Sequence, residues 1–288
     1  MVASRAAAID AAYASCVRQA RGHYENFPVA SLLLPPRMRR DVAAVYAFAR
    51  AADDFADEGD RSVEERHRLL DGWLRRLQHA ASSDEEGPDA RPGEPSNAVA
   101  IFLALGATIR RRRLPVALFE DLLSAFRQDV TQTRYDDWPD LLDYCRRSAN
   151  PVGRLVLRIA GYRDAQLDAW SDAVCTALQL TNFWQDLSVD LARGRCYLPG
   201  RGSHDESVIA ALAVAVNRTR ALFDAGRPLC DAVRGRLRYE LRATWLGGVR
   251  VLERVERLNL DAFHKRPALG LLDAPLLAAR LLVWSSLP

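Results

Sequence analysis

Apolar residues recur every three to four positions along most of the chain, the spacing typical of amphipathic α-helices. Alternation of apolar and polar residues, which would indicate β-strands, is almost absent. The pattern therefore predicts an all-α bundle of about ten helices. The expected helices span residues 4–22, 37–57, 62–80, 97–112, 115–129, 163–190, 205–223, 229–256 and 267–285, and a further one starts at 137 and is interrupted by Asn150-Pro151.

Local signals mark several of the expected helix boundaries. Ser62 and Glu65 have the spacing of a capping box at a helix start, and Gly59 is suited to end the helix before it. Residues 81–97 are polar and rich in Pro and Gly, which predicts a surface loop. Because the helical pattern resumes unchanged after this loop, residues 1–288 are expected to form a single domain.

One expected helix carries a narrow polar stripe in apolar surroundings. We call it the 179–190 stripe: Gln179, Asn182, Asp186 and Asp190 share one face at about 100° per residue. An ordinary amphipathic helix with this face in water is one interpretation. The alternative is a buried helix whose stripe lines a polar cavity.

A second stripe of the same kind favours the cavity. In the 46–57 stripe, Tyr46, Arg50, Asp53 and Asp57 again lie on one face of an otherwise apolar helix. If the two stripes face each other, four carboxylates meet in one apolar cavity, and they must then bind protons or cations.

The ligand types indicate which cation fits. Carboxylate and amide oxygens without His or Cys suit Mg²⁺, which usually keeps waters and shares its coordination with substrate phosphate oxygens. Zinc is disfavoured because no His/Cys cluster accompanies the acids, and a di-iron site is disfavoured because neither stripe contains His. Such a site fits ionisation of an allylic or cyclopropylcarbinyl diphosphate in an aromatic-lined pocket. The aromatic residues beside the stripes, each of which is individually more typical of an ordinary core position, are Phe27, Tyr46, Phe48, Tyr144, Phe183 and Trp184.

Composition excludes several other classes of protein. The net charge of +3 and the lack of a nucleic-acid motif argue against nucleic-acid binding. Five cysteines without metal-ligand spacing predict a reduced, cytoplasmic protein. The N-terminal residues do not contain the apolar core of a signal peptide. No run of 18 uncharged apolar residues occurs, so no membrane span is expected. The run Arg110–Arg113 is interpreted as a solvated helix end, with docking to an anionic membrane as the alternative.

The motifs together resemble those of the squalene/phytoene synthase family over essentially the whole chain. Both aspartate motifs of that family are matched, the second as Gln-x-x-Asn-x-x-x-Asp-x-x-x-Asp. A diphosphate-binding His near the N-terminus is matched by His23. Two further segments match the family as well, Tyr144, Cys145, Val152 and Gly153 in one and Gly194 to Pro199 in the other.

The resemblance implies an isoprenoid synthase helical bundle with a central cavity and two or three Mg²⁺ ions that bridge carboxylates and diphosphate. The implied metal ligands are Asp53, Asp57, Asn182, Asp186 and Asp190. The implied diphosphate-binding residues are His23, Asn26, Arg50 and Arg195. The residues expected to act in catalysis are Tyr46, Arg50, Tyr144, Gln179 and Asn182.

Within the family, residues 24–35, 144–153 and 181–186 resemble the hydroxysqualene synthase branch of bacterial hopanoid biosynthesis. This implies conversion of presqualene diphosphate to hydroxysqualene and diphosphate without NADPH. It also implies a sister enzyme that makes presqualene diphosphate and a flavin-dependent reductase that consumes the alcohol. Because the product is a long lipid, peripheral contact with the inner membrane is consistent with a cytoplasmic location.

Two positions depart from the wider family pattern. Gln185 stands where an Arg is usual, and Asn26 stands where several members have Ser. Loss of a fixed positive charge should weaken binding of a second diphosphate, and both amides are candidates to position the water that captures the cation. The alternative functions are head-to-head condensation of two prenyl diphosphates, giving squalene, presqualene diphosphate or phytoene, and a non-catalytic assembly factor.

Overall fold

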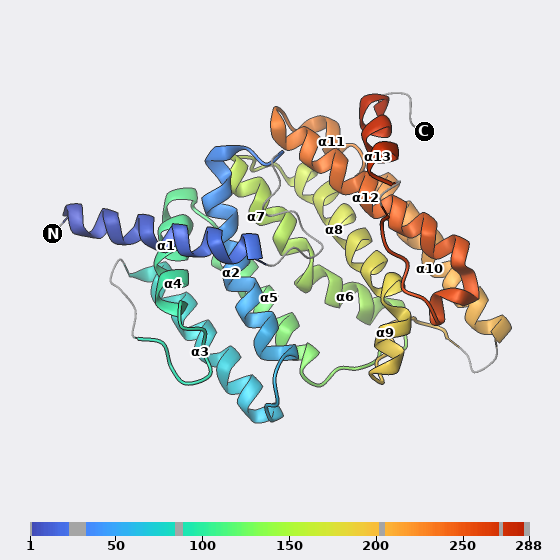
Figure 1. Ribbon diagram of the computed structural model, residues 1–288, viewed down its shortest axis with the longest axis horizontal. Coiled ribbons are helices and arrows are strands. Elements are labelled where there is room, and N and C mark those ends of the chain that lie inside the picture. Colours follow the sequence, from blue (N-terminus) through green and yellow to red (C-terminus); the bar gives the residue numbers. More distant parts are fainter. Residues whose placement is uncertain (1, 23–32, 84–88, 202–204, 271–272, 285–288) are drawn as a thin grey trace. The chain divides into compact units, whose positions relative to one another are not determined.

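The computed structural model describes residues 2–22, 33–83, 89–201, 205–270 and 273–284 (Figure 1). In these ranges the regular elements are helices, which confirms the predicted all-α class, and one isolated bridge joins Arg134 and Cys196. The chain divides into two compact units, residues 1–131 with 154–163 and residues 132–153 with 164–288. We call these unit 1 and unit 2; the expectation of a single domain stays a prediction.

Unit 1 is built around α2 (Pro36–Asp57), which contacts α1 (Val2–Gly22), α3 (Val63–Ser82), α4 (Ala98–Arg112) and α5 (Val116–Asp129) (Figure 1). Most of α7 (Asn150–Ala160) also belongs to this unit. Twelve of the 22 residues of α2 are buried, so this helix forms the centre of the core.

Aromatic side chains join α2 to its neighbours. Phe48 packs on Trp73 with ring centroids 6.1 Å apart, and Phe102 lies 4.5 Å from the same indole. The Trp73 indole N–H donates to the carbonyl of Phe48 at 3.1 Å. Phe48 was predicted either to line the expected pocket or to occupy an ordinary core position. It is completely buried, so it occupies a core position among the described residues of unit 1.

The boundary signals in unit 1 act as expected. The Glu65 N–H donates to Ser62 Oγ at 3.2 Å, and the Ser62 N–H donates to the Glu65 carboxylate at 3.0 Å, so the capping box is confirmed. Gly59 has φ +74°, a left-handed conformation in which Gly avoids the steric cost that a side chain brings, and α2 ends just before it.

The expectation of a solvated end at Arg110–Arg113 holds for the exposed Arg111 and Arg113, whereas Arg110 and Arg112 are partly buried. Arg110 donates to the Ala80 carbonyl at 2.6 Å, and Arg111 and Arg112 both pair with the fully buried Asp41, the latter at 2.7 Å. A buried carboxylate needs a cationic partner, and these guanidinium groups supply it from α4. The pairing joins residues about 70 positions apart, so the local pattern could not predict it.

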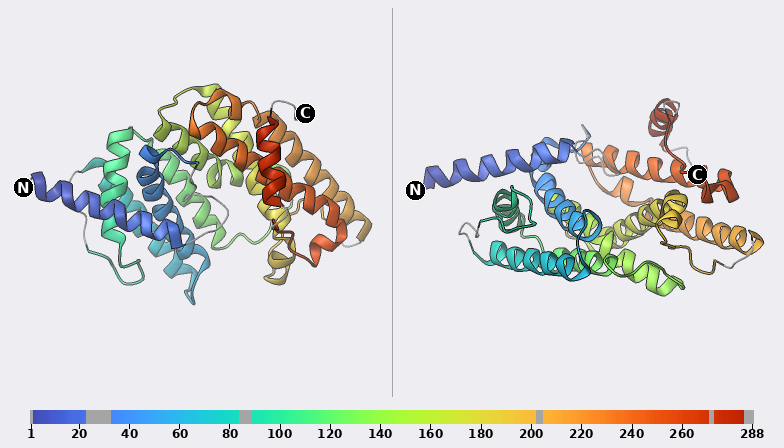
Figure 2. Two further views of the ribbon diagram at one scale, coloured as in Figure 1. Left: turned by 45° about the horizontal axis from the view of Figure 1, so that its top comes forward. Right: turned by 60° about the horizontal axis from the view of Figure 1, so that its bottom comes forward.

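Unit 2 is organised around α8 (Ala165–Gln185), which contacts α6 (Trp138–Ser148), α10 (Asp205–Gly226) and α12 (Arg236–Leu258) (Figures 1 and 2). Its remaining elements are short. They are α9 (Leu187–Ala192), α11 (Leu229–Ala232), the 3₁₀-helix η1 (Asn259–Phe263) and α13 (Asp273–Leu282).

Three expected helices of unit 2 have different bounds. The 163–190 helix is interrupted at Asp186, where the Val189 N–H bonds the carbonyl three residues back and a new turn begins. The 229–256 helix is broken before Gly235, whose φ of +65° is incompatible with a continuing helix. The last helix begins at Asp273 rather than at residue 267.

No helix among the described residues combines the length and the hydropathy that a bilayer span requires.

Candidate active site

The 46–57 stripe is the open face of α2. Tyr46, Arg50 and Asp53 are partly exposed and Asp57 is exposed, whereas the apolar residues around them are buried. The structure thus brings these four side chains together on one face of a core helix, as the spacing predicted.

Arg50 gathers the acids at the end of α2. Its guanidinium pairs with Asp53 at 3.3 Å, with Asp54 at 2.7 Å and with Glu58 at 2.5 Å. Its Nε is buried and has no hydrogen-bond partner among the described residues. This buried N–H donor has no partner in the described part of the chain and lies beside a row of carboxylates. Such an arrangement fits a site that would bind an anion together with cations.

Burial raises the pKa of the Asp53 carboxyl to about 6, although 45% of its side chain remains exposed. Arg50 opposes this shift in pKa, whereas the negative charges of Asp57, Asp54 and Glu58 increase it. The end of α2 therefore carries more negative charge than Arg50 neutralises. This is an environment in which a divalent cation would be stabilised.

The 179–190 stripe has the same character in unit 2. Gln179 and Asn182 on α8, and Asp186 directly after it, are partly exposed, whereas the neighbouring residues Leu180, Phe183 and Trp184 are buried. The Trp184 indole N–H donates to Thr219 Oγ1 at 2.8 Å, which ties this helix to α10. Asp190 follows on α9, also partly exposed.

Two contacts at Asp186 were not anticipated from the sequence. Arg266, in the segment after η1, forms an ion pair with the Asp186 carboxylate. The buried Gln185 amide donates to the Pro267 carbonyl at 2.7 Å and fixes the same segment in place. The Gln185 nitrogen is therefore already engaged, which argues against its use in positioning water. The only sequence signal for Arg266 is the basic pair Lys265-Arg266 before a proline.

The Gly194-to-Pro199 segment is held against the start of unit 2. The Cys196 N–H donates to the Thr133 carbonyl at 2.8 Å, and the Tyr135 N–H donates to the Cys196 carbonyl at 3.2 Å. Arg195 is partly exposed, and its backbone N–H donates to the Asp190 carbonyl at 2.8 Å. The segment thus orders the chain directly after Asp190, and the role of the Arg195 side chain stays a prediction.

Aromatic rings gather beside the 179–190 stripe. Phe183 lies with ring centroids 5.9 Å from Tyr144 and 4.6 Å from Tyr197, and Tyr135 contacts both tyrosines. All four side chains are less than one-tenth exposed. Tyr144 and Phe183, two of the predicted aromatic residues, therefore pack in one buried cluster, and their role towards a carbocation stays a prediction.

Close packing against α8 explains why a glycine stands at position 153, the last residue of the family segment Tyr144, Cys145, Val152 and Gly153. A Cβ at this position would lie 2.3 Å from Ser171 Oγ and 2.5 Å from Cys175 Sγ, so only Gly allows this close approach to α8. The Thr176 hydroxyl donates to the Asn150 side chain at 2.9 Å beside it. The segment positions the helix that carries Gln179.

His23 and Asn26 lie outside the described residues, so their predicted diphosphate contacts stay predictions. Within the described residues, neither unit alone gathers three or more His, Cys, Asp or Glu side chains as a metal-binding group. Each aspartate motif supplies oxygen donors from two carboxylates, and the second adds the Asn182 amide. This donor chemistry fits Mg²⁺ shared with phosphate oxygens.

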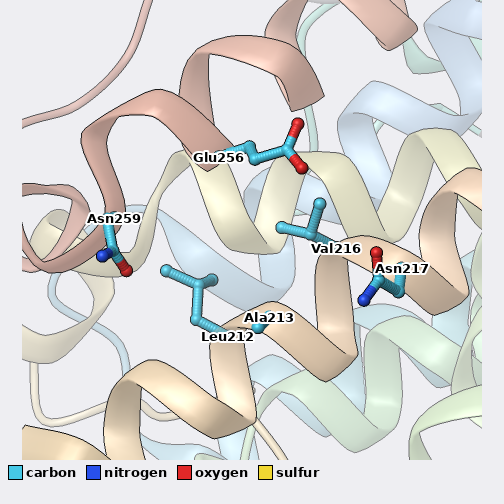
Figure 3. Close-up of a pocket in the computed structure, with 6 residues that line it drawn as sticks. All are labelled: Leu212, Ala213, Val216, Asn217, Glu256 and Asn259. Carbon is cyan, nitrogen blue, oxygen red and sulfur yellow. The ribbon is translucent and has the colours of Figure 1, made fainter.

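A separate small cavity of about 100 Å³ lies between α10 and the end of α12 in unit 2 (Figure 3). Its lining contains none of the predicted site residues. The lining residues are Leu212, Ala213, Val216, Asn217, Glu256 and Asn259.

Comparison with known proteins gives consistent similarities. Residues 20–273 match the family described as squalene/phytoene synthase. The chain is 35% identical over 237 residues to hydroxysqualene synthase of Rhodopseudomonas palustris, covering 77% of this chain and 76% of that protein. It is 37% identical over 226 residues to hydroxysqualene synthase of Zymomonas mobilis, covering 76% and 68%. The crystal structure of squalene synthase HpnC from Alicyclobacillus acidocaldarius superposes with TM-score 0.75 at 38% identity, covering 87% of this chain and 95% of that one.

Proposed function

This chain belongs to the squalene/phytoene synthase family, and from that premise we propose that it converts presqualene diphosphate to hydroxysqualene and free diphosphate. Two relatives named hydroxysqualene synthase support the product of this proposal. The proposed reaction breaks the carbon–oxygen bond to diphosphate, which leaves with the bonding electrons. The cyclopropylcarbinyl cation then rearranges, adds water and loses a proton.

One observation carries the proposal: each of the two acidic stripes is the partly open face of an otherwise buried helix. A helix of a scaffold protein gains no stability from acids next to its core, because burial raises their free energy unless they are neutralised. In the proposal, both aspartate pairs act on the same diphosphate. This requirement explains why such costly groups are kept in both units.

Bound Mg²⁺ would supply Lewis-acid stabilisation of the departing diphosphate. Asp53, Asp57, Asp186, Asp190 and Asn182 are the residues that would hold the two or three ions. The Arg50 guanidinium, with its unused buried Nε, donates to phosphate oxygens in this arrangement, and its charge stabilises the leaving group.

The aromatic cluster around Phe183 gives the cation a second kind of stabilisation. The ring faces of Tyr144 and Phe183 attract positive charge, and their burial limits the access of water. Tyr46 on α2 and Gln179 on α8 are proposed to orient the reacting chain or the capturing water. His23, Asn26 and Arg195 complete the proposed diphosphate contacts.

In this scheme the reaction consumes no NADPH, because water rather than hydride ends it. The substrate comes from a sister synthase that makes presqualene diphosphate, and the product alcohol goes to a flavin-dependent reductase. A cytoplasmic enzyme in peripheral contact with the inner membrane suits both lipids.

The test uses purified protein with Mg²⁺ and without NADPH, given presqualene diphosphate in one reaction and farnesyl diphosphate in another. Mass spectrometry of the extracted lipids should find hydroxysqualene in the first and no condensation product in the second. Squalene, presqualene diphosphate or phytoene-type products from a prenyl diphosphate would instead establish the head-to-head alternative. Absence of any product together with absence of Mg²⁺-diphosphate binding would indicate an assembly factor.

A further inference from the structure

Two consecutive residues at the end of α8 hold two consecutive residues of a distant stretch of the chain. We call residues 264–270, which follow η1, the 264–270 segment. The buried Gln185 donates to the carbonyl of Pro267 at 2.7 Å, and Pro267 is buried as well. Beside them, the Nε of Arg266 donates to one carboxylate oxygen of Asp186, and its Nη2 lies 3.4 Å from the other. The 264–270 segment is therefore fixed at two adjacent points of unit 2.

The hydrogen bond from Gln185 sets how close the 264–270 segment lies to α8. A carbonyl oxygen only accepts, so the amide nitrogen of Gln185 must face Pro267. The other residues of the segment are exposed and belong to no helix, and the bond from Arg254 to the Ala268 carbonyl at 2.7 Å holds them to α12 instead. Without the Gln185 donor, a buried carbonyl would lose its partner, and the segment would have to shift away from α8 to reach water.

The pairing of Arg266 with Asp186 depends on this anchor. The Arg266 side chain is 49% exposed and that of Asp186 is 28% exposed. An ion pair this close to water gains little by itself, because ordering a long side chain offsets the attraction. The Gln185 bond acts one residue away and already fixes the backbone that carries Arg266, so less conformational entropy is lost when the pair forms.

Arg266 occupies the position of a counter-ion to the 179–190 stripe. Asp186 and Asp190 lie four residues apart, and carboxylates at this spacing repel each other unless a cation is near. Because the guanidinium faces both oxygens of Asp186, a metal ion has to compete with it for this carboxylate. Any group that holds Arg266 in place therefore also affects the affinity of the stripe for a cation.

We propose that Gln185 is a positioning residue for metal binding: through Pro267 it holds Arg266 on Asp186 as an internal counter-ion that Mg²⁺ must displace. This inference rests on the proposed function, because it takes Asp186 as a metal ligand. In this role Gln185 touches neither the metal nor the substrate. It determines the Mg²⁺ concentration at which the stripe exchanges the guanidinium for the metal, and it keeps Asp186 neutralised in the metal-free protein.

The test is a Mg²⁺ titration of the melting temperature without substrate, in a double-variant cycle of Gln185→Met and Arg266→Gln. Methionine resembles glutamine in length but has no N–H to donate. Gln185→Asn is a second variant, since its amide remains but is too short to reach Pro267. Gln132→Met is the matched control, because the Gln132 amide also donates to a backbone carbonyl, that of Arg134.

We expect the midpoint of the titration to lie at about two- to five-fold lower Mg²⁺ in both Gln185 variants than in the native chain, as in Arg266→Gln. The double variant should shift the midpoint no further than Arg266→Gln alone, because both changes remove the same competitor. Gln132→Met should leave the midpoint unchanged. In the metal-free protein, hydrogen exchange of the amides in the 264–270 segment should be faster in the Gln185 variants than in the native chain.

A purely structural role of Gln185 would lower the melting temperature and leave the Mg²⁺ midpoint at its native value. That result overturns the proposal, and so do additive shifts of the midpoint in the double variant. If the native chain responds to Mg²⁺ and makes hydroxysqualene while the Gln185 variants keep its midpoint, only the positioning role is wrong. If neither the native chain nor any variant responds to Mg²⁺, the proposed metal site is wrong as well.

Discussion

Arg266 neutralises a carboxylate that the proposed reaction needs. Because its guanidinium and Mg²⁺ would compete for Asp186, we expect Arg266→Gln to increase the apparent affinity for Mg²⁺ in the absence of substrate. Exposed ion pairs contribute about 0.2–1 kcal/mol, so the increase should be a few-fold. Titration of the melting temperature with Mg²⁺ measures it. Lys265→Gln is the control, because this neighbour pairs with Asp261 instead. If both variants have the same midpoint of the Mg²⁺ titration, Arg266 does not compete with Mg²⁺ for Asp186.

The aspartates of the two stripes should be separable into catalytic and stabilising effects. We expect Asp53→Asn and Asp186→Asn each to lower turnover by at least about 100-fold, because each removes a charge that would hold the metal ions on the diphosphate. Neither should lower the melting temperature of the metal-free protein by more than a few degrees, because both side chains are partly exposed. Steady-state kinetics and calorimetry provide the two measurements.

Asp168→Asn, in the first turn of α8, makes the same chemical change away from the stripe. Its turnover should stay within about two-fold of the native value, because surface substitutions of this kind act weakly. Near-native turnover in Asp53→Asn or Asp186→Asn would refute the proposed metal ligands.

The sequence could predict the residues of each stripe because their relation is local. Offsets of three and four place Arg50 near Asp53 on any α-helix, and the structure places these side chains 3.3 Å apart. The pairing of Arg266 with Asp186 joins positions 80 residues apart, so it depends on how α8 packs near η1. No periodicity in one sequence encodes such a pair.

At the scale of helices, the contact of Gly153 with α8 is the tightest of the predicted segments. Gly153→Ala should destabilise the protein by about 1–3 kcal/mol, because the new methyl group would overlap Ser171 Oγ and Cys175 Sγ. Gly247→Ala, on α12, is the control, since nothing lies within 4 Å of its would-be Cβ and Ala is the better helix former. Chemical unfolding should show a lower free energy of unfolding for Gly153→Ala than for the native protein, and a higher one for Gly247→Ala. Changes of the same sign in both variants would mean that α8 accommodates the new methyl group without loss of stability.

The attachment of α13 should depend on pH in a defined direction. The Gly270 N–H, followed by Arg250 and Arg254, lowers the pKa of Asp273 to about 2. A depressed pKa stabilises the folded state above the unfolded pKa of about 4, and this stabilisation is lost as the pH falls towards 2. The melting temperature of Asp273→Asn should therefore lie below that of the native protein at pH 7. This difference in melting temperature should narrow between about pH 4 and 2.

Asp261→Asn serves as the comparison for that experiment. Asp261 is exposed and its pKa is lowered by Lys265, so its loss removes only a surface ion pair. If the difference in melting temperature between Asp273→Asn and the native protein does not change with pH, the packing of α13, rather than the charge of Asp273, determines the stability of this attachment.

Helix bounds were predictable where a boundary residue acts through its own neighbours. The capping box at Ser62 and the break at Asn150-Pro151 were correct because the groups that end each helix lie within four residues. The interruption at Asp186 was missed because the apolar pattern continues through it without change. Gly235 was a usable signal for the break before α12, but Gly inside a helical pattern is ambiguous without its φ.

For the whole molecule, the relevant fact is that each compact unit carries one aspartate stripe. The 46–57 stripe belongs to unit 1 and the 179–190 stripe to unit 2. Each unit thus supplies two of the four aspartates that the proposal assigns to one diphosphate. If the proposal is right, binding of Mg²⁺ with diphosphate must therefore link the units energetically, because each would hold part of the same ligand.

Hydrogen exchange can test this link. Mg²⁺ with inorganic diphosphate should protect amides near Asp57 on α2 and amides of α9, by about tenfold at saturation of the weak ligand. In the double variant Asp53→Asn/Asp57→Asn, protection should be lost on α9 as well, although every changed residue lies in unit 1. Asp168→Asn should keep protection in both places. Full protection of α9 in the double variant would mean that the 179–190 stripe binds its ligand alone, and the two stripes would then be separate sites.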